Sequence, residues 1–439
     1  RNGNIMNPTS NQIIIIGIEV FAVIVLVLIF TGILPGLKPS QPKTGSGGIS
    51  NGSQTTEINF WGVEDEGVIK PIIESYLTVN PNSRVFYTQF NESNYEKNLV
   101  DALASGKAPD IIMLHNNWLP KHYGKILPIP ASSGFSITQI RQLFPTVVEQ
   151  DFTNNGNIYA LPIYIDTLAF IYNKDYFDAK GVAIVPKNWN EFQYVISRLK
   201  EVDSSGKIFK AAAAIGGSNK SIEKAPDLLS LIMLQMGVEM VDKNNSANFS
   251  KSEGENALNF YLQFSNPNSS NYTWHDNFRY SMEGFSQEII GAIFNYADSI
   301  KNIKEKNPFL NIEVAPMLQF PNKKSVNYAN YWGLAVPVQS KNTISAWNFI
   351  LYFSADAKVA EQYLQASKRP PALRELIQKY SNDADLGVFA RQALTAQSWR
   401  QKDNSGVRKS FSNMIESILN GRLSLDKALE RAENEINSL

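Results

Sequence analysis

Apolar and polar positions follow two periods at the start of the globular part of the chain, and together they predict strands separated by helices. Residues 58–61 and 84–89 alternate with the two-residue period of a strand, whereas residues 68–79 carry apolar side chains at helical spacing. A second amphipathic stretch ends at Gly106, where a helix cap favours a left-handed residue, and the apolar run 111–114 follows. This order of elements is typical of a parallel sheet covered by helices.

Polar and aromatic side chains follow the ends of the first and third of these strands. Trp61 and Glu64 lie at the end of the first strand, and Asn116, Asn117 and Trp118 come after the third. In open α/β sheets ligands bind in the crevice beyond the carboxyl ends of the strands. The sequence therefore predicts a crevice bordered by both segments.

Amphipathic periods predict further helices along the rest of the chain, and no internal repeat is visible. These helices cover residues 189–201, 228–236, 253–264, 286–290, 345–353 and 357–366, and a long set from about residue 384 that breaks near Gly421.

The N-terminal part contains one long apolar segment. Residues 13–34 have the length that crosses a hydrocarbon core, and Glu19 is the only charged residue among them. The segment is longer than the apolar region of a cleaved signal peptide and lacks its small-residue cleavage site. Residues 35–56 are rich in Pro, Gly and Ser, which predicts a flexible linker. We therefore expect a single-pass anchor in the cell membrane and an extracytoplasmic globular domain.

Composition removes several classes of function. The 439 residues exceed one ordinary core, so two or more compact units are expected. Lys and Arg number 41, as do Asp and Glu, so no net basic charge attracts nucleic acid. The absence of Cys excludes disulfides, thiolate nucleophiles and cysteine metal sites.

Enzyme and metal chemistry have little support in the sequence. There are three His residues, no G-x-S-x-G elbow and no glycine-rich phosphate loop, so we expect no catalytic triad, no zinc site and no cofactor. The loop beginning at Asp242 imitates a calcium loop, but Ala247 replaces the glycine that the sharp turn requires. Glu64 and Asp166 could form the carboxylate pair of a glycosidase, although nothing in the local sequence requires it.

Aromatic residues next to strand ends or glycine and proline breaks suggest a sugar ligand, because sugar rings stack on aromatic planes. The alternative for each of them is packing in a core. These residues are Trp61, Trp118, Tyr164, Tyr296, Trp332 and Trp399. Asp166 lies in an apolar block where an unpaired carboxylate would be costly, so it either caps backbone amides or accepts ligand hydroxyls.

Six motifs in order resemble the extracellular solute-binding proteins of ABC importers, the maltose-binding-protein-like group, over about residues 58–437. They include INFWGVEDE, ALASGKAPDIIML, GNIYALPIYIDTLAFIYNKDYF and YWGLAVPVQSKNTISAWNFILYFS. The resemblance implies an α/β, two-lobed periplasmic-binding-protein type II fold with a cleft between the lobes. It implies one lobe from residues 57–164 with 299–338 and another from residues 165–298 with 339–439. The chain would cross between them near residues 164–166, 295–299 and 336–340.

The same resemblance implies a non-catalytic, monomeric solute-binding subunit that closes on a mono- or oligosaccharide and meets the permease subunits of an ABC importer. The tryptophans of the early strands and those of the C-terminal half would face each other across a solvent-filled gap. The predicted ligand-binding residues are Trp61, Glu64, Asn116, Asn117, Trp118, Tyr164, Asp166, Tyr296, Trp332 and Trp399. Two alternatives stay open: a membrane-anchored glycan-processing enzyme, and a sensory or adhesive ectodomain on the same fold.

Overall fold

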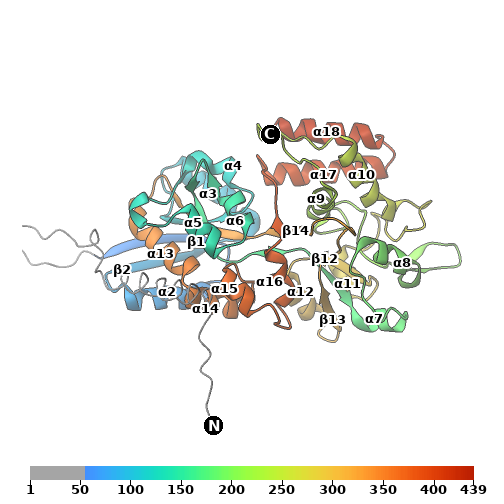
Figure 1. The fold of residues 1–439 in the computed structure, drawn as a ribbon, viewed down its shortest axis with the longest axis horizontal. Coiled ribbons are helices and arrows are strands. Elements are labelled where there is room, and N and C mark those ends of the chain that lie inside the picture. Colours follow the sequence, from blue (N-terminus) through green and yellow to red (C-terminus); the bar gives the residue numbers. More distant parts are fainter. Residues whose placement is uncertain (1–54) are drawn as a thin grey trace, which may run out of the picture. The chain divides into compact units, whose positions relative to one another are not determined.

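A computed structural model describes residues 55–439 of the protein (Figure 1). The predicted anchor, residues 13–34, and residues 35–54 of the predicted linker lie outside this range. From residue 55 onward, no helix has both the length and the apolar character needed to cross a membrane.

The first sheet contains the strands that the two-residue period predicts. Strands β1 (Thr56–Gly62), β2 (Ser83–Gln89) and β3 (Ile111–His115) are parallel, with β1 in the middle. Strand β15 (Trp332–Pro337) pairs antiparallel with β3 and continues the order β2-β1-β3-β15-β4. Strands β4 (Ile126–Leu127) and β7 (Ala160–Pro162) both pair with β15.

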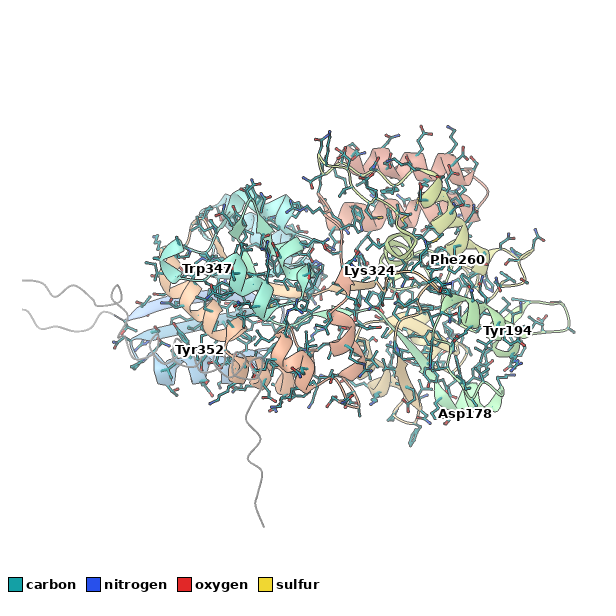
Figure 2. The ribbon with its side chains drawn as sticks, viewed as in Figure 1. Asp178, Tyr194, Phe260, Lys324, Trp347 and Tyr352 are labelled. Atoms are coloured by element: carbon teal, nitrogen blue, oxygen red, sulfur yellow. The ribbon has the colours of Figure 1, made fainter. Side chains whose placement is uncertain are left out.

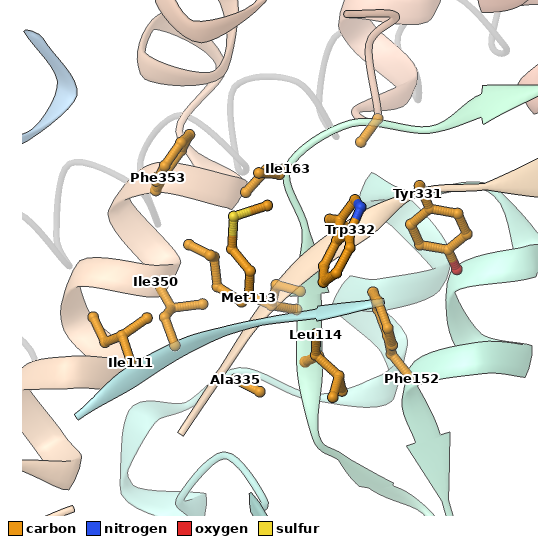
Figure 3. Close-up of a cluster of buried hydrophobic side chains, with 14 of the residues drawn as sticks. Ile111, Met113, Leu114, Phe152, Ile163, Tyr331, Trp332, Ala335, Ile350 and Phe353 are labelled. Atoms are coloured by element: carbon orange, nitrogen blue, oxygen red, sulfur yellow. The ribbon is translucent and has the colours of Figure 1, made fainter. Parts of the chain in front are cut away.

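Helices cover this sheet and complete a first hydrophobic core, which defines the first lobe. Helix α13 packs against β1 and β15, and Met113, Trp332, Ile350 and Phe353 belong to the buried cluster between them (Figure 3). Tyr352 of α13 (Figure 2) shares a 2.7 Å hydrogen bond with Ser75 of α2. The helices of this lobe are α2 (Glu66–Val79), α3 (Glu92–Ala104), α4 (Leu119–His122), α5 (Ile137–Leu143), α6 (Thr146–Phe152), α13 (Thr343–Ala355), α14 (Ala357–Ser367) and α15 (Arg374–Lys379).

A second core, which defines the second lobe, forms around a smaller antiparallel sheet. Strand β9 (Ala169–Asn173) lies between β12 (Ala292–Asn295) and β13 (Ile312–Ala315). Trp189 of α8 is fully buried in this core. Its helices are α7 (Lys174–Ala179), α8 (Trp189–Leu199), α9 (Ala225–Met236), α10 (Ser252–Leu262), α11 (Ser281–Ser286), α12 (Asp298–Lys306), α17 (Asn404–Leu419) and α18 (Leu425–Asn437).

Short strands connect the two cores. Strands β8 (Asp166–Thr167), β14 (Asn327–Asn330) and β16 (Ala396–Gln397) form a sheet in the order β16-β14-β8. Ile165 packs in the first core and Leu168 in the second, so the chain crosses between the lobes there. It crosses back between Tyr328 of the second core and Ala329 of the first. Helix α16 (Gly387–Ala393) precedes β16, and two further hairpins pair β5 (Thr153–Asn154) with β6 (Asn157–Ile158) and β10 (Glu201–Val202) with β11 (Ile208–Lys210).

This division of the chain differs from the expected one in two places. Residues 299–326 belong with the second core, because β13 pairs with β9. Residues 339–377 belong with the first core, because α13 and α14 pack on its sheet and on α2. The segments 295–299 and 336–340 therefore do not cross between the lobes.

Most predicted helices are present with bounds shifted by a few residues, and one is wrong. The helix expected at residues 286–290 instead spans Ser281–Ser286. It cannot continue, because Glu288 has a left-handed backbone with φ of 61°. Gly106 and Gly421, predicted to end helices, are also left-handed, with φ of 71° and 65°.

Candidate functional site

A cavity of about 260 Å³ lies where the two lobes meet beyond the end of β3. The first lobe contributes Asn116, Asn117, Leu119, Pro120, Tyr123, Asp151 and Asn154 to its wall, and the second contributes Asn245, Trp399, Arg400, Gln401 and Lys402. Three of the ten predicted ligand-binding residues, Asn116, Asn117 and Trp399, are among them.

The two asparagines directly follow β3 and are held by hydrogen bonds. The Asn116 backbone N–H donates to the carbonyl of Tyr331 (3.0 Å), and its Oδ1 accepts from the Tyr331 N–H (3.3 Å). Its Nδ2 donates to Asp151 (3.0 Å) and to Oδ1 of Asn117 (3.3 Å). The hydrogen bonds therefore assign the two ends of the Asn116 amide: Nδ2 is the donor and Oδ1 is the acceptor.

Trp399 forms part of the opposite wall and is anchored in the second core. Its indole Nε1 donates to Ser230 of α9 (3.3 Å), and its ring stacks on Phe411 of α17 with centroids 6.1 Å apart. The indole is therefore rigidly held, and although its residue is only 3% exposed it forms part of the cavity wall.

Gln401, two residues further on, supplies an unused acceptor. Its Nε2 donates to the hydroxyl of Tyr328 (3.3 Å). Its Oε1 is buried and has no hydrogen-bond partner within residues 55–439. Such a group is costly unless a ligand or water donates to it.

The other three tryptophans of the prediction belong to the first core. Trp118 and Trp332 pack edge to face with centroids 5.0 Å apart, and both contact Tyr95. Trp61 packs on Phe90 at 4.7 Å. The expected gap between Trp118 and Trp332 is absent, because β15 pairs with β3 in a register that sets Trp332 opposite His115.

Glu64 and Tyr164 lie in a second polar cluster at the lobe boundary, around Arg369. The guanidinium is 4.8 Å from the Tyr164 ring centroid, 3.5 Å from Oε1 of Glu64 and 3.1 Å from Oδ2 of Asp298 in the second lobe. Burial raises the pKa of Glu64, and the charge of Arg369 partly offsets this.

Asp166 and Tyr296 also have partners within the protein. Asp166 accepts from the backbone N–H groups of Thr167 (2.8 Å) and Ala297 (3.0 Å), which corresponds to the capping alternative. Burial, with the nearby charge of Asp298, raises the pKa of Asp166 to about 8. The Tyr296 hydroxyl donates to Asp227 (2.8 Å).

Several cavity residues escaped the sequence analysis. Asp151 lies within helix α6, where an acid ordinarily faces solvent, yet its side chain is only 7% exposed. Burial raises its pKa to about 6 despite three hydrogen bonds. Asn245 has a left-handed backbone, with φ of 60°, and Gln401 follows Trp399 closely. A turn at Asn245 and the nearness of Gln401 to Trp399 could have indicated those two residues, whereas Asp151 had no local signal.

Metal ligands do not gather in the part of the chain that the structure covers, where no three His, Asp or Glu side chains could hold an ion together. The Asp242 loop that imitates a calcium site folds on itself instead. Oδ1 of Asp242 accepts from the N–H groups of Asn244 (2.8 Å) and Ser246 (2.9 Å).

Burial lowers the pKa of His115 to about 4, which keeps its imidazole neutral at physiological pH.

Residues 64–360 match the model of the bacterial extracellular solute-binding protein family. The match covers more than half of the chain, and the protein belongs to this family. A protein of Brucella abortus (strain 2308), whose name gives it as a binding protein without a ligand, is 23% identical over 347 residues. These residues are 76% of this chain and 80% of that protein.

Solved structures of this kind share the two-lobed α/β fold. An ABC transporter solute-binding protein of Thermotoga lettingae bound with α-D-tagatose aligns with a TM-score of 0.70 at 20% identity, over 87% of this chain and 99% of that chain. The sugar-binding protein MalE of Xanthomonas citri aligns at 0.72 and 19%, over 87% and 97%. A cyclic α-maltosyl-1,6-maltose binding protein of Arthrobacter globiformis aligns at 0.73 and 16%, over 87% and 98%.

Proposed function

We propose that this protein binds a carbohydrate in the cavity between Asn116 and Trp399 and presents it to the permease of an ABC importer. The observation that carries the proposal is the composition of the cavity wall. It combines a rigid indole with the amides of Asn116, Asn117 and Gln401, and Gln401 keeps a buried acceptor free for a ligand hydroxyl. Stacking surfaces with planar amides suit the C–H faces and hydroxyl rim of a sugar.

The size of the cavity favours a small ligand. Its volume of about 260 Å³ lies just below the ~300–1,000 Å³ typical of small-molecule pockets. A mono- or disaccharide fits this range better than a long oligosaccharide. The sugars in the solved structures of the same fold support the class of ligand and leave its identity open.

Closure follows from the position of the wall residues on two lobes. A ligand that contacts Asn116 and Trp399 together makes all its contacts only when the lobes are closed, so binding favours that state. Lys121 of the first lobe already reaches Asp403 of the second at 2.7 Å. Ligand would add to such contacts.

The proposal also includes attachment to the membrane. The apolar residues 13–34 would anchor the chain, and the residues rich in Pro, Gly and Ser would tether the solute-binding domain outside the cytoplasm. We expect a monomer in the membrane.

A ligand screen on the full chain tests the proposal. Thermal unfolding is followed with neutral mono- and disaccharides, and hits are measured by calorimetry. Saturation at a hundred times Kd should stabilise the protein by about 2.7 kcal/mol. Trp399→Phe should reduce that shift. Unchanged sugar after long incubation separates binding from glycan processing, and a screen without any sugar hit would contradict the proposal.

A further inference from the structure

Asp151 joins three separate segments of the chain at the cavity wall. Its Oδ2 accepts from Nδ2 of Asn116 (3.0 Å) and from the hydroxyl of Tyr331 (2.9 Å). Its Oδ1 accepts from the hydroxyl of Ser398. The carboxylate thus accepts hydrogen bonds from three neutral donors. They lie at the end of β3, in the link between β14 and β15, and in the segment after β16.

These donors lead directly to both walls of the cavity. Asn116 lines the first-lobe wall, and Ser398 immediately precedes Trp399 of the second-lobe wall. Gln150, next to Asp151 on α6, strengthens the second link by donating to the carbonyl of Ser398 (2.6 Å). One turn of α6 therefore sets the position of two groups that would face the ligand from opposite sides.

The Asn116 amide makes this arrangement sensitive to the charge of Asp151. Tyr331 and Ser398 carry hydroxyls, which can turn and accept a hydrogen bond. Asn116 cannot turn its amide, because Oδ1 is needed by the backbone N–H of Tyr331 (3.3 Å). Its Nδ2 must therefore find an acceptor at Asp151, and a carboxylate provides one more reliably than a carboxylic acid.

We propose that Asp151 is a positioning residue of the ligand pocket, which orients the Asn116 amide and fixes the segment of Trp399 through Ser398. The proposal rests on the carbohydrate-binding function for its ligand, but its structural part is independent of it. Burial of a carboxylate without a salt bridge costs stability, which suits a residue kept for the pocket rather than for the fold.

The charged and titratable groups around Asp151 limit what a pH titration near 6 can report. Arg400 approaches from the segment after β16 and favours the anionic form, and Tyr331 approaches from the crossing strand as a neutral donor. His115, one residue before Asn116, is neutral throughout this range because its pKa is about 4. His122 of α4, which pairs with Glu96 at 3.0 Å, is a further titratable group near this wall, so the Asp151→Asn variant is needed to assign a transition near pH 6 to Asp151.

The first test needs no ligand. The full chain is labelled with 5-fluorotryptophan, which gives seven sites, and the Trp399 resonance is assigned with Trp399→Phe. We expect that resonance to shift between pH 5 and 8 with a midpoint near 6, because burial raises the pKa of Asp151 to about 6. Asp151→Asn should abolish the transition. A transition that persists in Asp151→Asn would overturn the proposal.

The matched control is Glu149→Gln on the same helix, whose side chain pairs with Arg141 at 2.6 Å away from the cavity. It should keep the Trp399 transition and the ligand affinity of the unaltered protein. Loss of the transition in this variant would show that any charge change on α6 has the same effect, which would also overturn the proposal.

The second test uses the sugar found by the screen, or tagatose and maltose where none was found. At pH 7.5, Asp151→Asn should weaken binding about tenfold, a loss of about 1.4 kcal/mol in binding free energy. The cooperativity of unfolding should stay unchanged. Affinity of the unaltered protein should fall as pH drops below 6, and the variant should lack this step. Equal affinity of both proteins would overturn the proposal. No binding by either sugar, with the Trp399 transition present, would instead refute the carbohydrate function and leave the positioning role standing.

Discussion

Two polar clusters contain residues of both lobes, and they differ in the kinds of side chain that they bring together. Around Arg369, the acids Glu64 and Asp298 neutralise the guanidinium, and Tyr164 covers its face. At the cavity, amides and the Trp399 indole line the wall together with Asp151, Arg400 and Lys402, and Gln401 keeps a free acceptor. The comparison shows that the charged cluster is held by its own ion pairs although Oε1 of Glu64 has no hydrogen-bond partner within residues 55–439, whereas the cavity wall adds amides and an indole that a ligand could contact.

The largest effect is expected from breaking the Arg369 cluster. Arg369→Met leaves the buried carboxylate of Glu64 without its cation, which should lower the free energy of unfolding by about 3 kcal/mol. Ligand affinity of the folded protein should change little. Chemical denaturation measures the loss, and Glu64→Gln added to Arg369→Met should restore most of it. A stable single variant that loses ligand would reverse the roles of the two clusters.

Substitutions at Trp399 should lower ligand affinity, and because this side chain is only 3% exposed they should also lower the free energy of unfolding. Trp399→Ala removes the stacking surface and should weaken sugar binding about a hundredfold, roughly 2.7 kcal/mol. Trp399→Phe keeps the packing against Phe411 and should lose about tenfold. Calorimetry gives both values, and Tyr194→Ala, at an exposed position on α8 (Figure 2), is the control. Equal affinities in all three variants would place the ligand elsewhere.

The pH dependence of stability tests whether Asp166 is protonated in the folded protein. Its folded pKa of about 8 lies above the unfolded value, so the folded protein holds a proton that the unfolded chain releases. Stability should therefore fall as pH rises from 6.5 to 8, by roughly 2 kcal/mol over that window. Urea unfolding measures the slope, and Asp166→Asn should flatten it. Stability that does not change with pH in this window would show that Asp166 is already anionic in the fold.

The smallest effect concerns the ion pair across the cavity rim. Lys121 bridges Glu96 at 3.0 Å and Asp403 at 2.7 Å, and its side chain is 30% exposed. Asp403→Asn should cost about 0.5 kcal/mol of closure, or roughly a twofold loss of affinity, and the loss should shrink at high salt. Calorimetry at two salt concentrations checks this. A loss that grows with salt would contradict an electrostatic origin.

Local patterns in the sequence predicted the elements well, because periodicity and caps act over a few residues. The strands β1, β2 and β3 and the glycine end of α3 follow from such patterns alone. The division into lobes depends instead on which strands pair. Nothing near residues 312–315 reveals that β13 joins β9, and nothing near residues 343–367 reveals that two helices return to the first sheet.

The candidate site was predictable only where it follows directly from a strand end. Asn116 and Asn117 lie beyond the carboxyl end of β3, as the topology requires. Trp332 looked equivalent in the sequence, but its register opposite His115 turned it into the first core. Asp151 could not be found, because its burial depends on Tyr331 and Ser398, which are far away in the chain.

Fluorine NMR of the 5-fluorotryptophan protein during a sugar titration tests the central claim most directly. Binding of a carbohydrate between Asn116 and Trp399 should shift the Trp399 resonance in a saturable way while the fully buried Trp347 stays unchanged. A bound sugar, established by calorimetry, that leaves the Trp399 resonance at its free position would contradict the account.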